Sequence, residues 1–413
     1  MRLPMLQPLR HRDFRLLWSG QTISLVGNGF FSVALTWQTL QISATPGALA
    51  IVTIARSVPR LALLLIGGAV ADRVSRRSLI LGSDIAQGVG VAVLAMLAAA
   101  DRVEIWHLAA LAALVGTANA FHLPSITSIL PQLVPRDDLV RANALRSGSE
   151  MFAHNLVGPA LGGVVVAAFG TAVAFGIDAL TFAISAVALM AIRSRPASEP
   201  SEQSLRAELL EGLNYARSQR WLWISLVAVA FANLFFAGAL SILVPLLIKN
   251  ELQGTASQLG AYYAAIGVGA GLAILLTAHL AGERRRIPLA FGAWAVSALG
   301  FGAIGLTDSI YVVIGCGAFI GAGLQYGNLM WETLLQESVP QRLLGRITSL
   351  DWFVSLALEP ASLALAAPIA AAWGSSTALV WAGALDVVVL AFGYFQRGVR
   401  DATPESLEQD ASG

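Results

Sequence analysis

The chain has 413 residues, of which 56% are hydrophobic and only 12% are charged. Soluble domains carry roughly a quarter charged residues, so this composition excludes an ordinary soluble protein and favours one that lies in a lipid bilayer. The formal net charge of +1 and the single cysteine give no reason to expect a nucleic-acid partner or an internal disulfide.

Apolar segments long enough to cross a bilayer recur along the chain. A membrane-spanning helix needs about 20 mostly apolar residues, and twelve segments meet this requirement. In chain order they are 14–42, 47–71, 78–100, 105–130, 141–169, 171–192, 221–248, 257–281, 287–307, 309–331, 346–372 and 375–395. The sequence therefore predicts an all-α membrane protein with twelve transmembrane helices.

The basic residues fall on one side of these segments. With a cytoplasmic N-terminus, the non-cytoplasmic connections hold only Arg102 and Lys249, while Arg56 and Arg60 lie inside the second segment. All other Lys and Arg residues are then cytoplasmic, which is the bias that orients membrane proteins. We therefore expect both termini to be cytoplasmic.

The second half of the sequence repeats the first. Residues 128–145 align with 333–350 at an offset of 205, and the basic loop 71–79 aligns with 281–289 at an offset of 210. Because both pairs lie in cytoplasmic connections, duplication of a six-helix unit explains them better than chance. The duplication predicts a first half over 1–192 and a second half over 221–396.

Polar stretches lie between and after the two halves. The linker 193–220 begins with Pro, Ser and Glu, and over 204–219 its leucines recur on one face of a predicted amphipathic helix. The tail 397–413 is polar and acidic toward its end, which is typical of a disordered cytoplasmic segment.

A short basic loop joins the second and third segments. It matches the pattern Gly-x-x-x-Asp-Arg-x-Gly-Arg-Arg, which follows helix 2 in major facilitator superfamily transporters, with Ser75 in place of the usual Gly. The matching residues are Gly68, Asp72, Arg73, Arg76 and Arg77. The chain resembles this superfamily, and the resemblance implies two pseudo-symmetric six-helix halves that alternate access to a central substrate site.

Three further segments narrow the resemblance. Residues 14–21, 135–145 and 344–350 are similar to the group of the bacterial enterobactin exporter and the macrolide-efflux proteins. This similarity implies a secondary active exporter of small amphipathic organic molecules (drug-, macrolide- or siderophore-like) in the bacterial inner membrane. It also implies proton antiport by a monomer without a cofactor. A metabolite importer and a non-transporting membrane sensor or scaffold are the alternatives.

No sequence element indicates an enzyme. The chain has no nucleotide-binding Gly-Lys-Ser/Thr loop, no Cys/His spacing of a metal site and no nucleophile elbow. An ion gradient, rather than ATP, is therefore the expected source of energy.

The basic loop also suggests a conformational latch. Asp72 would accept hydrogen bonds from amides at the N-terminus of a neighbouring helix, and Arg73 and Arg76 would pair across the closed cytoplasmic face, with Asp351 as the opposing carboxylate. Such a latch would stabilise the outward-open state. Anchoring by basic residues is the alternative, which explains the arginines but not Asp72.

The fifth segment contains a Gly-Pro-x-x-Gly-Gly element, which resembles the one that marks exporters, especially antiporters, in the superfamily. Its residues are Gly158, Pro159, Gly162 and Gly163. Proline removes a backbone hydrogen bond and bends the helix, and small residues permit close helix contact. An ordinary packing kink is the alternative interpretation.

Ionisable residues inside the segments are costly and mark candidate functional sites. His154 and Glu359 are related by the 205-residue offset and are the first candidates to carry a coupling proton, with Asp84 next. In the first segment, Asn28 stands where many exporters of the resembling group have an acid, so that proton site is expected to be absent.

Other polar residues inside the segments leave two roles open. Arg56 and Arg60, one turn apart, either bind an anionic group of a substrate or pair with Asp84 or another buried acid. Asp178 and Asp386, each in the last segment of a half, are expected to be structural. Candidate hydrogen-bonding groups for a bound molecule are Asn28, Asn119, His122, Asn233, Gln325 and Asn328.

Overall fold

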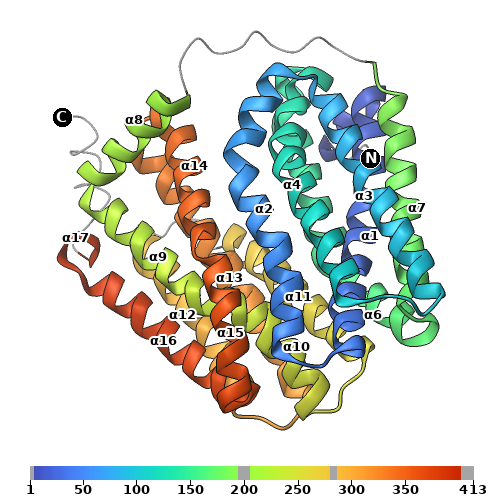
Figure 1. Ribbon diagram of the computed structural model, residues 1–413. Helices are drawn as coiled ribbons and strands as arrows, with labels where there is room; N and C mark the ends of the chain where they lie inside the picture. Colours follow the sequence, from blue (N-terminus) through green and yellow to red (C-terminus); the bar gives the residue numbers. More distant parts are fainter. Residues whose placement is uncertain (1–3, 194–204, 280–285, 401–413) are drawn as a thin grey trace. The chain divides into compact units, whose positions relative to one another are not determined.

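The computed structural model describes residues 4–193, 205–279 and 286–400, and the regular structure of these residues is helical throughout (Figure 1). They form two compact units. The first unit contains α1 to α7 and the start of α11, over Gln253–Ala264, and the second contains α8 to α10, the rest of α11 and α12 to α17.

Each unit is a bundle of long helices joined by short connections. The first-unit elements are η1 (Pro4–Arg10), α1 (Arg12–Ile42), α2 (Pro46–Arg73), α3 (Arg76–Ala99), α4 (Ile105–Leu133), η2 (Arg136–Asp138), α5 (Leu139–Ser149), η3 (Glu150–Val157), α6 (Gly158–Phe169) and α7 (Thr171–Met190). The elements that follow are α8 (Leu205–Ser218), α9 (Arg220–Gly238), η4 (Ala239–Leu243), α10 (Val244–Leu246), η5 (Leu247–Glu251), α11 (Ala256–His279), α12 (Arg286–Gly305), α13 (Ile310–Ser338), α14 (Gln341–Ala357), α15 (Glu359–Trp373), α16 (Ser375–Phe395) and α17 (Arg397–Arg400).

Within the described residues, 11 helices are long and apolar enough to cross a membrane, so this is an all-α integral membrane protein. The expected first span, α1, is 31 residues long, but polar residues such as Asn28 and Gln38 make it less apolar than those eleven. The count of twelve therefore stays a prediction. Several expected boundaries differ by a few residues; for example, α4 and α13 continue past the expected ends at 130 and 331 to Leu133 and Ser338.

Three spans are interrupted near a proline. The π-helical segment η3 lies directly before Pro159, the π-helical segments η4 and η5 flank Pro245, and α14 ends just before Pro360. Proline has no N–H to donate to the helix ladder, and π-segments occur often at functional sites. The η3 interruption carries His154, one of the candidate residues.

The linker and the tail are described in part. Helix α8 occupies most of the stretch expected to be an amphipathic helix, whereas residues 194–204 lie outside the described part. Arg397–Arg400, expected within a disordered tail, instead forms the short helix α17, because Val399 is buried. Residues 401–413 also lie outside the description.

The duplication seen in the sequence recurs in the helix packing inside each unit. A Cβ atom at Gly116 of α4 would lie 2.0 Å from the backbone oxygen of Arg56 in α2. In the second unit, a Cβ atom at Gly321 of α13 would lie 1.9 Å from the backbone oxygen of Ile266 in α11. Because these positions are related by the offsets of 205 and 210, the two crossings are repeat-related.

The helix ends after the prolines repeat as well. Gly170 ends α6 with φ 82°, and Gly374 ends α15 with φ 78°. Positive φ is accessible to glycine at little cost. A glycine with positive φ therefore ends the corresponding span in each unit.

The first prediction concerns the Gly116 crossing. Because a Cβ atom there meets a backbone carbonyl, Gly116→Ala must push α2 away from α4, and overpacking of this kind typically costs about 1–3 kcal/mol. We expect a lower Tm for the detergent-purified protein. Gly82→Ala is the matched control, since Gly82 has no neighbouring atom within 4 Å of its Cβ position. An unchanged Tm for Gly116→Ala would contradict the close crossing.

Candidate functional site

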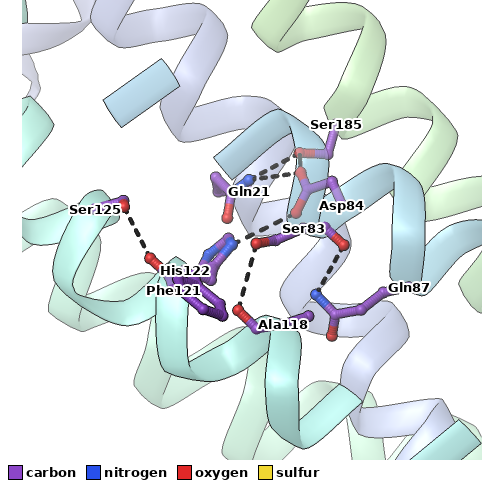
Figure 2. Close-up of polar contacts among 9 residues, drawn as sticks. All are labelled: Gln21, Ser83, Asp84, Gln87, Ala118, Phe121, His122, Ser125 and Ser185. Carbon is purple, nitrogen blue, oxygen red and sulfur yellow. Dashed lines mark hydrogen bonds and ion pairs between the residues drawn. The ribbon is translucent and has the colours of Figure 1, made fainter. Parts of the chain in front are cut away.

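A buried carboxylate lies at the centre of a polar network in the first unit (Figure 2). Asp84 of α3 is 1% exposed. Its Oδ2 accepts hydrogen bonds from Gln21 Nε2 of α1 at 3.0 Å and from Ser185 Oγ of α7 at 2.7 Å. Its Oδ1 lies 3.6 Å from Nδ1 of His122 on α4. Four helices thus converge on one carboxyl group.

The Asp84–His122 contact is incomplete. Asp84 Oδ1 and His122 Nδ1 are both buried and neither has a hydrogen-bond partner in the described part of the chain. A buried charge without full hydrogen bonding is costly in a membrane. Asp84 Oδ1 and His122 Nδ1 are only 3.6 Å apart, so a proton bound by one group changes the electrostatic environment of the other. The arrangement is therefore suited to binding and releasing a proton.

Close packing brings the network together. A Cβ atom at Gly20 of α1 would lie 2.9 Å from Ala188 Cβ and 3.2 Å from Ser185 Cα, so glycine allows α1 to approach α7. This approach lets Gln21 donate to Ser185 Oγ at 2.8 Å as well as to Asp84. Helices α3 and α4 are joined by Ser83 Oγ, which donates to the backbone oxygen of Ala118 at 3.3 Å.

The second unit fills the same place with an apolar contact. The repeat offsets relate Asp84 to Trp294 and His122 to Gly327. A Cβ atom at Gly327 would lie 2.5 Å from the Trp294 ring, and Trp294 Nε1 donates to Asn328 Oδ1 at 3.0 Å. The Trp294 ring therefore packs on Gly327 at this helix crossing. Helices can pack in this way without an ionisable pair at the crossing.

The arginines of α2 do not supply the charge that faces Asp84. Arg56 and Arg60 are half-buried one turn apart. The polar groups that contact Asp84 are instead Gln21, Ser185 and His122. Both Asp84 and His122 were named from the sequence, but His122 was assigned to a bound molecule and its contact with Asp84 was not predicted. A comparison of the two halves would have found it, because charged residues at 84 and 122 correspond to Trp and Gly.

The structure describes only some residues of the expected latch. The side chains of Gly68, Asp72 and Arg73 lie outside the described part of the structure. Arg77 donates from Nε to the backbone oxygen of Leu189 at 2.7 Å and from Nη2 to that of Met190 at 2.8 Å. It therefore caps the C-terminal end of α7, where a cation is favoured, and this role was not foreseen.

Ser75, beside the expected latch, and two of its members, Arg76 and Asp351, lie in the described part of the structure. Ser75, the departure from the family pattern, precedes α3 and its Oγ accepts from the Ser78 backbone N–H at 3.2 Å, which is an N-cap. Arg76 is the first residue of α3. Asp351 of α14 accepts a hydrogen bond from Trp331 Nε1 at 3.0 Å inside the second unit.

The glycines of the Gly-Pro-x-x-Gly-Gly element give α6 two close faces. On one face, a Cβ atom at Gly162 would lie 2.8 Å from Phe30 Cα of α1. On the other, a Cβ atom at Gly163 would lie 2.9 Å from Gly260 Cα of α11. Gly158 similarly faces Gly29 of α1 at 2.8 Å, measured from a built Cβ atom to Cα. The element therefore combines the Pro159 interruption with backbone-to-backbone helix contact.

The remaining candidates are spread over several helices. His154 lies in η3 of the first unit and its Nδ1 is buried without a hydrogen-bond partner, whereas Glu359 begins α15 of the second unit. Asp178 is fully buried, and Thr181 Oγ1 lies 3.4 Å from its Oδ1; Asp386 is 3% exposed on α16. Half-buried on α1, α4, α9 and α13 are Asn28, Asn119, Asn233, Gln325 and Asn328.

The chain matches a family model described as transmembrane secretion effector over residues 4–409. Curated relatives include the enterobactin exporters EntS of Escherichia coli and of Escherichia fergusonii. Each is 28% identical over 405 residues, which cover 92% of this chain and 92% of the relative.

Solved transporters share the fold. A variant of the nucleoside transporter NupG matches with a TM-score of 0.69 at 10% identity, over 91% of this chain and 100% of that one. A POT family transporter in complex with 5-aminolevulinic acid matches with a TM-score of 0.66 at 13% identity, over 92% and 95%.

The second prediction tests the Asp84–His122 contact by stability. In a double-mutant cycle of Asp84→Asn and His122→Gln, we expect the two effects on unfolding to be non-additive by about 0.5–3 kcal/mol, because residues in one network couple. Tm values of the four purified forms provide the measurement. The pair Asp178→Asn and His122→Gln is the control and should be additive. Additive effects for Asp84 and His122 would rule out the contact.

Proposed function

The chain belongs to the transmembrane secretion effector family of the major facilitator superfamily, and from this membership we propose that it exports small organic molecules across the bacterial inner membrane. It is a transporter and an integral membrane protein, not an enzyme. The bias of basic residues supports a topology with both termini cytoplasmic. We take the transporting species to be a monomer.

The proposed substrates are small amphipathic molecules, such as siderophore-like, macrolide-like or other drug-like compounds. The enterobactin exporters among the relatives support this class. The polar groups available inside the spans are mostly amides on otherwise apolar helices, which suits an amphipathic solute better than a sugar or an inorganic ion. The nucleoside and POT transporters show only the fold, since their identities to this chain are 10% and 13%.

Proton antiport is the proposed energy source, and the Asp84–His122 pair is the observation that carries it. Unprotonated, the Asp84 carboxylate holds α1 and α7 through the hydrogen bonds from Gln21 and Ser185. Protonation removes the negative charge that strengthens these bonds. Proton binding would thus weaken the hydrogen bonds that join α3 to α1 and α7. This weakening would link protonation to helix movement.

Two other elements complete the proposal. The loop residues Asp72, Arg73 and Arg76, with Asp351, would form the latch that stabilises the outward-open state. The glycine faces of α6 would provide the surface on which the spans move. His154 and Glu359 are the competing proton carriers, and the experiments below separate them from Asp84.

The third prediction tests coupling. In inside-out vesicles with an acidic interior, we expect the wild type to accumulate enterobactin or erythromycin, and Asp84→Asn to lose this pH-driven accumulation while substrate counterflow without a gradient continues. Glu359→Gln should keep both activities. Asp178→Asn is the matched control, because Asp178 is an equally buried carboxyl group in the same unit.

Each outcome of this experiment assigns the coupling residue. If Asp84→Asn keeps pH-driven accumulation and Glu359→Gln loses it, Glu359 carries the proton instead. If neither substrate moves in the wild type under any gradient, the export function itself is wrong. Accumulation only in right-side-out vesicles would favour a metabolite importer.

The fourth prediction concerns the contact between α6 and α11. Gly163→Ala places a methyl group 2.8 Å from the backbone oxygen of Ala256 and 2.9 Å from Gly260 Cα. We expect slower counterflow at unchanged expression, because the two helices can no longer pass at backbone distance. Gly148→Ala of α5 has open space at its Cβ position and should transport at the wild-type rate. Equal rates for both variants would make the element ordinary packing.

A further inference from the structure

Asp84 is enclosed on all sides, so a proton can reach its carboxyl group by few routes. The side chain is 1% exposed, and its Oδ2 is occupied by the donors Gln21 Nε2 and Ser185 Oγ. Its Oδ1 is buried and accepts no hydrogen bond in the described part of the chain. Because a proton binds a carboxylate at an unoccupied lone pair, the proton must arrive at Oδ1.

His122 of α4 is the residue that faces Oδ1 (Figure 2). Its Nδ1 lies 3.6 Å from Asp84 Oδ1 and is buried, whereas the His122 side chain as a whole is 17% exposed. The exposed part of the ring therefore lies at atoms other than Nδ1. The imidazole thus extends from the buried acid to an accessible edge, which the carboxyl group itself lacks.

The accessible edge of His122 lies on a polar face of α4. Asn119, three residues earlier and therefore on the same face of the helix, is half-buried like His122. Polar side chains inside a membrane span face the protein interior or water rather than lipid tails. The polar face therefore indicates that the imidazole edge meets water.

Other ionisable residues in the described part of the chain offer no second route to Asp84. Helices α1 and α7 contribute only the neutral donors Gln21 and Ser185 to the carboxyl group. The charged or titratable residues inside the neighbouring spans form no hydrogen bond or ion pair with Asp84 or His122; they are Arg56, Arg60, Arg146, Glu150, His154 and Asp178.

We infer that His122 is the proton relay of Asp84: the Nε2 atom of His122 exchanges protons with water, and its Nδ1 atom exchanges them with Asp84 Oδ1. Before loading, the carboxylate faces a neutral imidazole with its proton on Nδ1. A proton from water binds Nε2, and the Nδ1 proton then passes to Oδ1. The result is a neutral carboxyl group beside a neutral imidazole with its proton on Nε2. One proton has been gained, and the reverse steps release it.

The geometry suits such a relay. For the transfer, Nδ1 and Oδ1 must approach from 3.6 Å to about 3 Å, the reach of a general acid, and such contacts are often long in a resting structure. A histidine also gains and loses a proton near neutral pH. Gly327 occupies the repeat-related position in the second unit, so the helix crossing itself does not require an imidazole.

The inference rests on the proposed coupling through Asp84 and adds the route by which the proton arrives. Asp84 is the residue that bonds to α1 and α7, so its protonation state affects helix packing. His122 has no such bonds to these helices in the described part of the chain. Loss of His122 should therefore slow the loading of Asp84 without preventing it.

The test measures protonation of Asp84 in the detergent-purified full-length protein, so the result does not depend on transport. After a rapid drop in pH, the carboxylic C=O infrared band of Asp84 is followed with time and is identified by its loss in Asp84→Asn. In His122→Gly, we expect the band to appear about a hundredfold more slowly, the scale that a positioned acid or base contributes. The final amplitude at full protonation should equal that of the wild type.

Chemical rescue separates the relay from a structural role. Imidazole in solution should restore fast loading in His122→Gly, whereas pyrazole, a ring of the same size but a much weaker base, should not. His122→Gln should load as slowly and respond to neither ring, because its side chain fills the site. His107→Gln, which changes a histidine in the first turn of the same helix, is the control and should load like the wild type. The Tm of every variant checks the fold.

The outcomes distinguish the relay from the export function. Loading at the wild-type rate in His122→Gly or His122→Gln overturns the relay, and so does equal rescue by imidazole and pyrazole. A wild type without a pH-dependent Asp84 band overturns both the relay and the coupling role of Asp84, even where vesicles export enterobactin. Loading that depends on imidazole in His122→Gly, in a protein that moves no substrate in vesicles, supports the relay and contradicts export.

Discussion

Backbone contact through glycine is the constraint on which both units depend. Lipid tails are as apolar as leucine side chains, so helices in a bilayer associate through packing and polar contacts rather than through the hydrophobic effect. Gly116 against Arg56 and Gly321 against Ile266 bring neighbouring helices so close that a Cβ atom at either glycine would overlap a backbone oxygen. Gly20 does the same for α1 and α7. These contacts fix which side chains meet, and the polar networks follow from them.

The two units share this packing but differ in what they place beside it. At repeat-related positions the first unit has Asp84 and His122 where the second has Trp294 and Gly327. Helix α2 of the first unit likewise has Arg56 where α11 of the second unit has Ile266. The duplicated backbone therefore supplies the scaffold, and the ionisable chemistry near the centre of these spans belongs to one copy. Such asymmetry separates residues that hold the fold from residues that act.

The sequence was a good guide to the spans and a poorer guide to the contacts between them. Long apolar stretches predict membrane helices because their burial in lipid depends on composition alone, and the interruption near Pro159 follows from a missing backbone donor. The interruption near Pro360 has the same cause but was not predicted. Contacts such as Asp84 with His122 depend on the rotation of each helix, which an almost wholly apolar sequence specifies weakly. The capping roles of Arg77 and Ser75 were not predicted, because basic residues in a short loop were interpreted through membrane topology and the latch.

An ionisable pair in only one unit has a consequence for the membrane potential. On the proposed scheme, a single Asp84–His122 pair takes one proton inward per cycle. With an uncharged cargo, each cycle therefore transfers one positive charge inward. At about 2.3 kcal/mol per charge for every 100 mV, the voltage across the membrane contributes to export even where the pH gradient is small. Export of a cargo with one positive charge would cancel the charge of the proton, and the voltage would then contribute nothing.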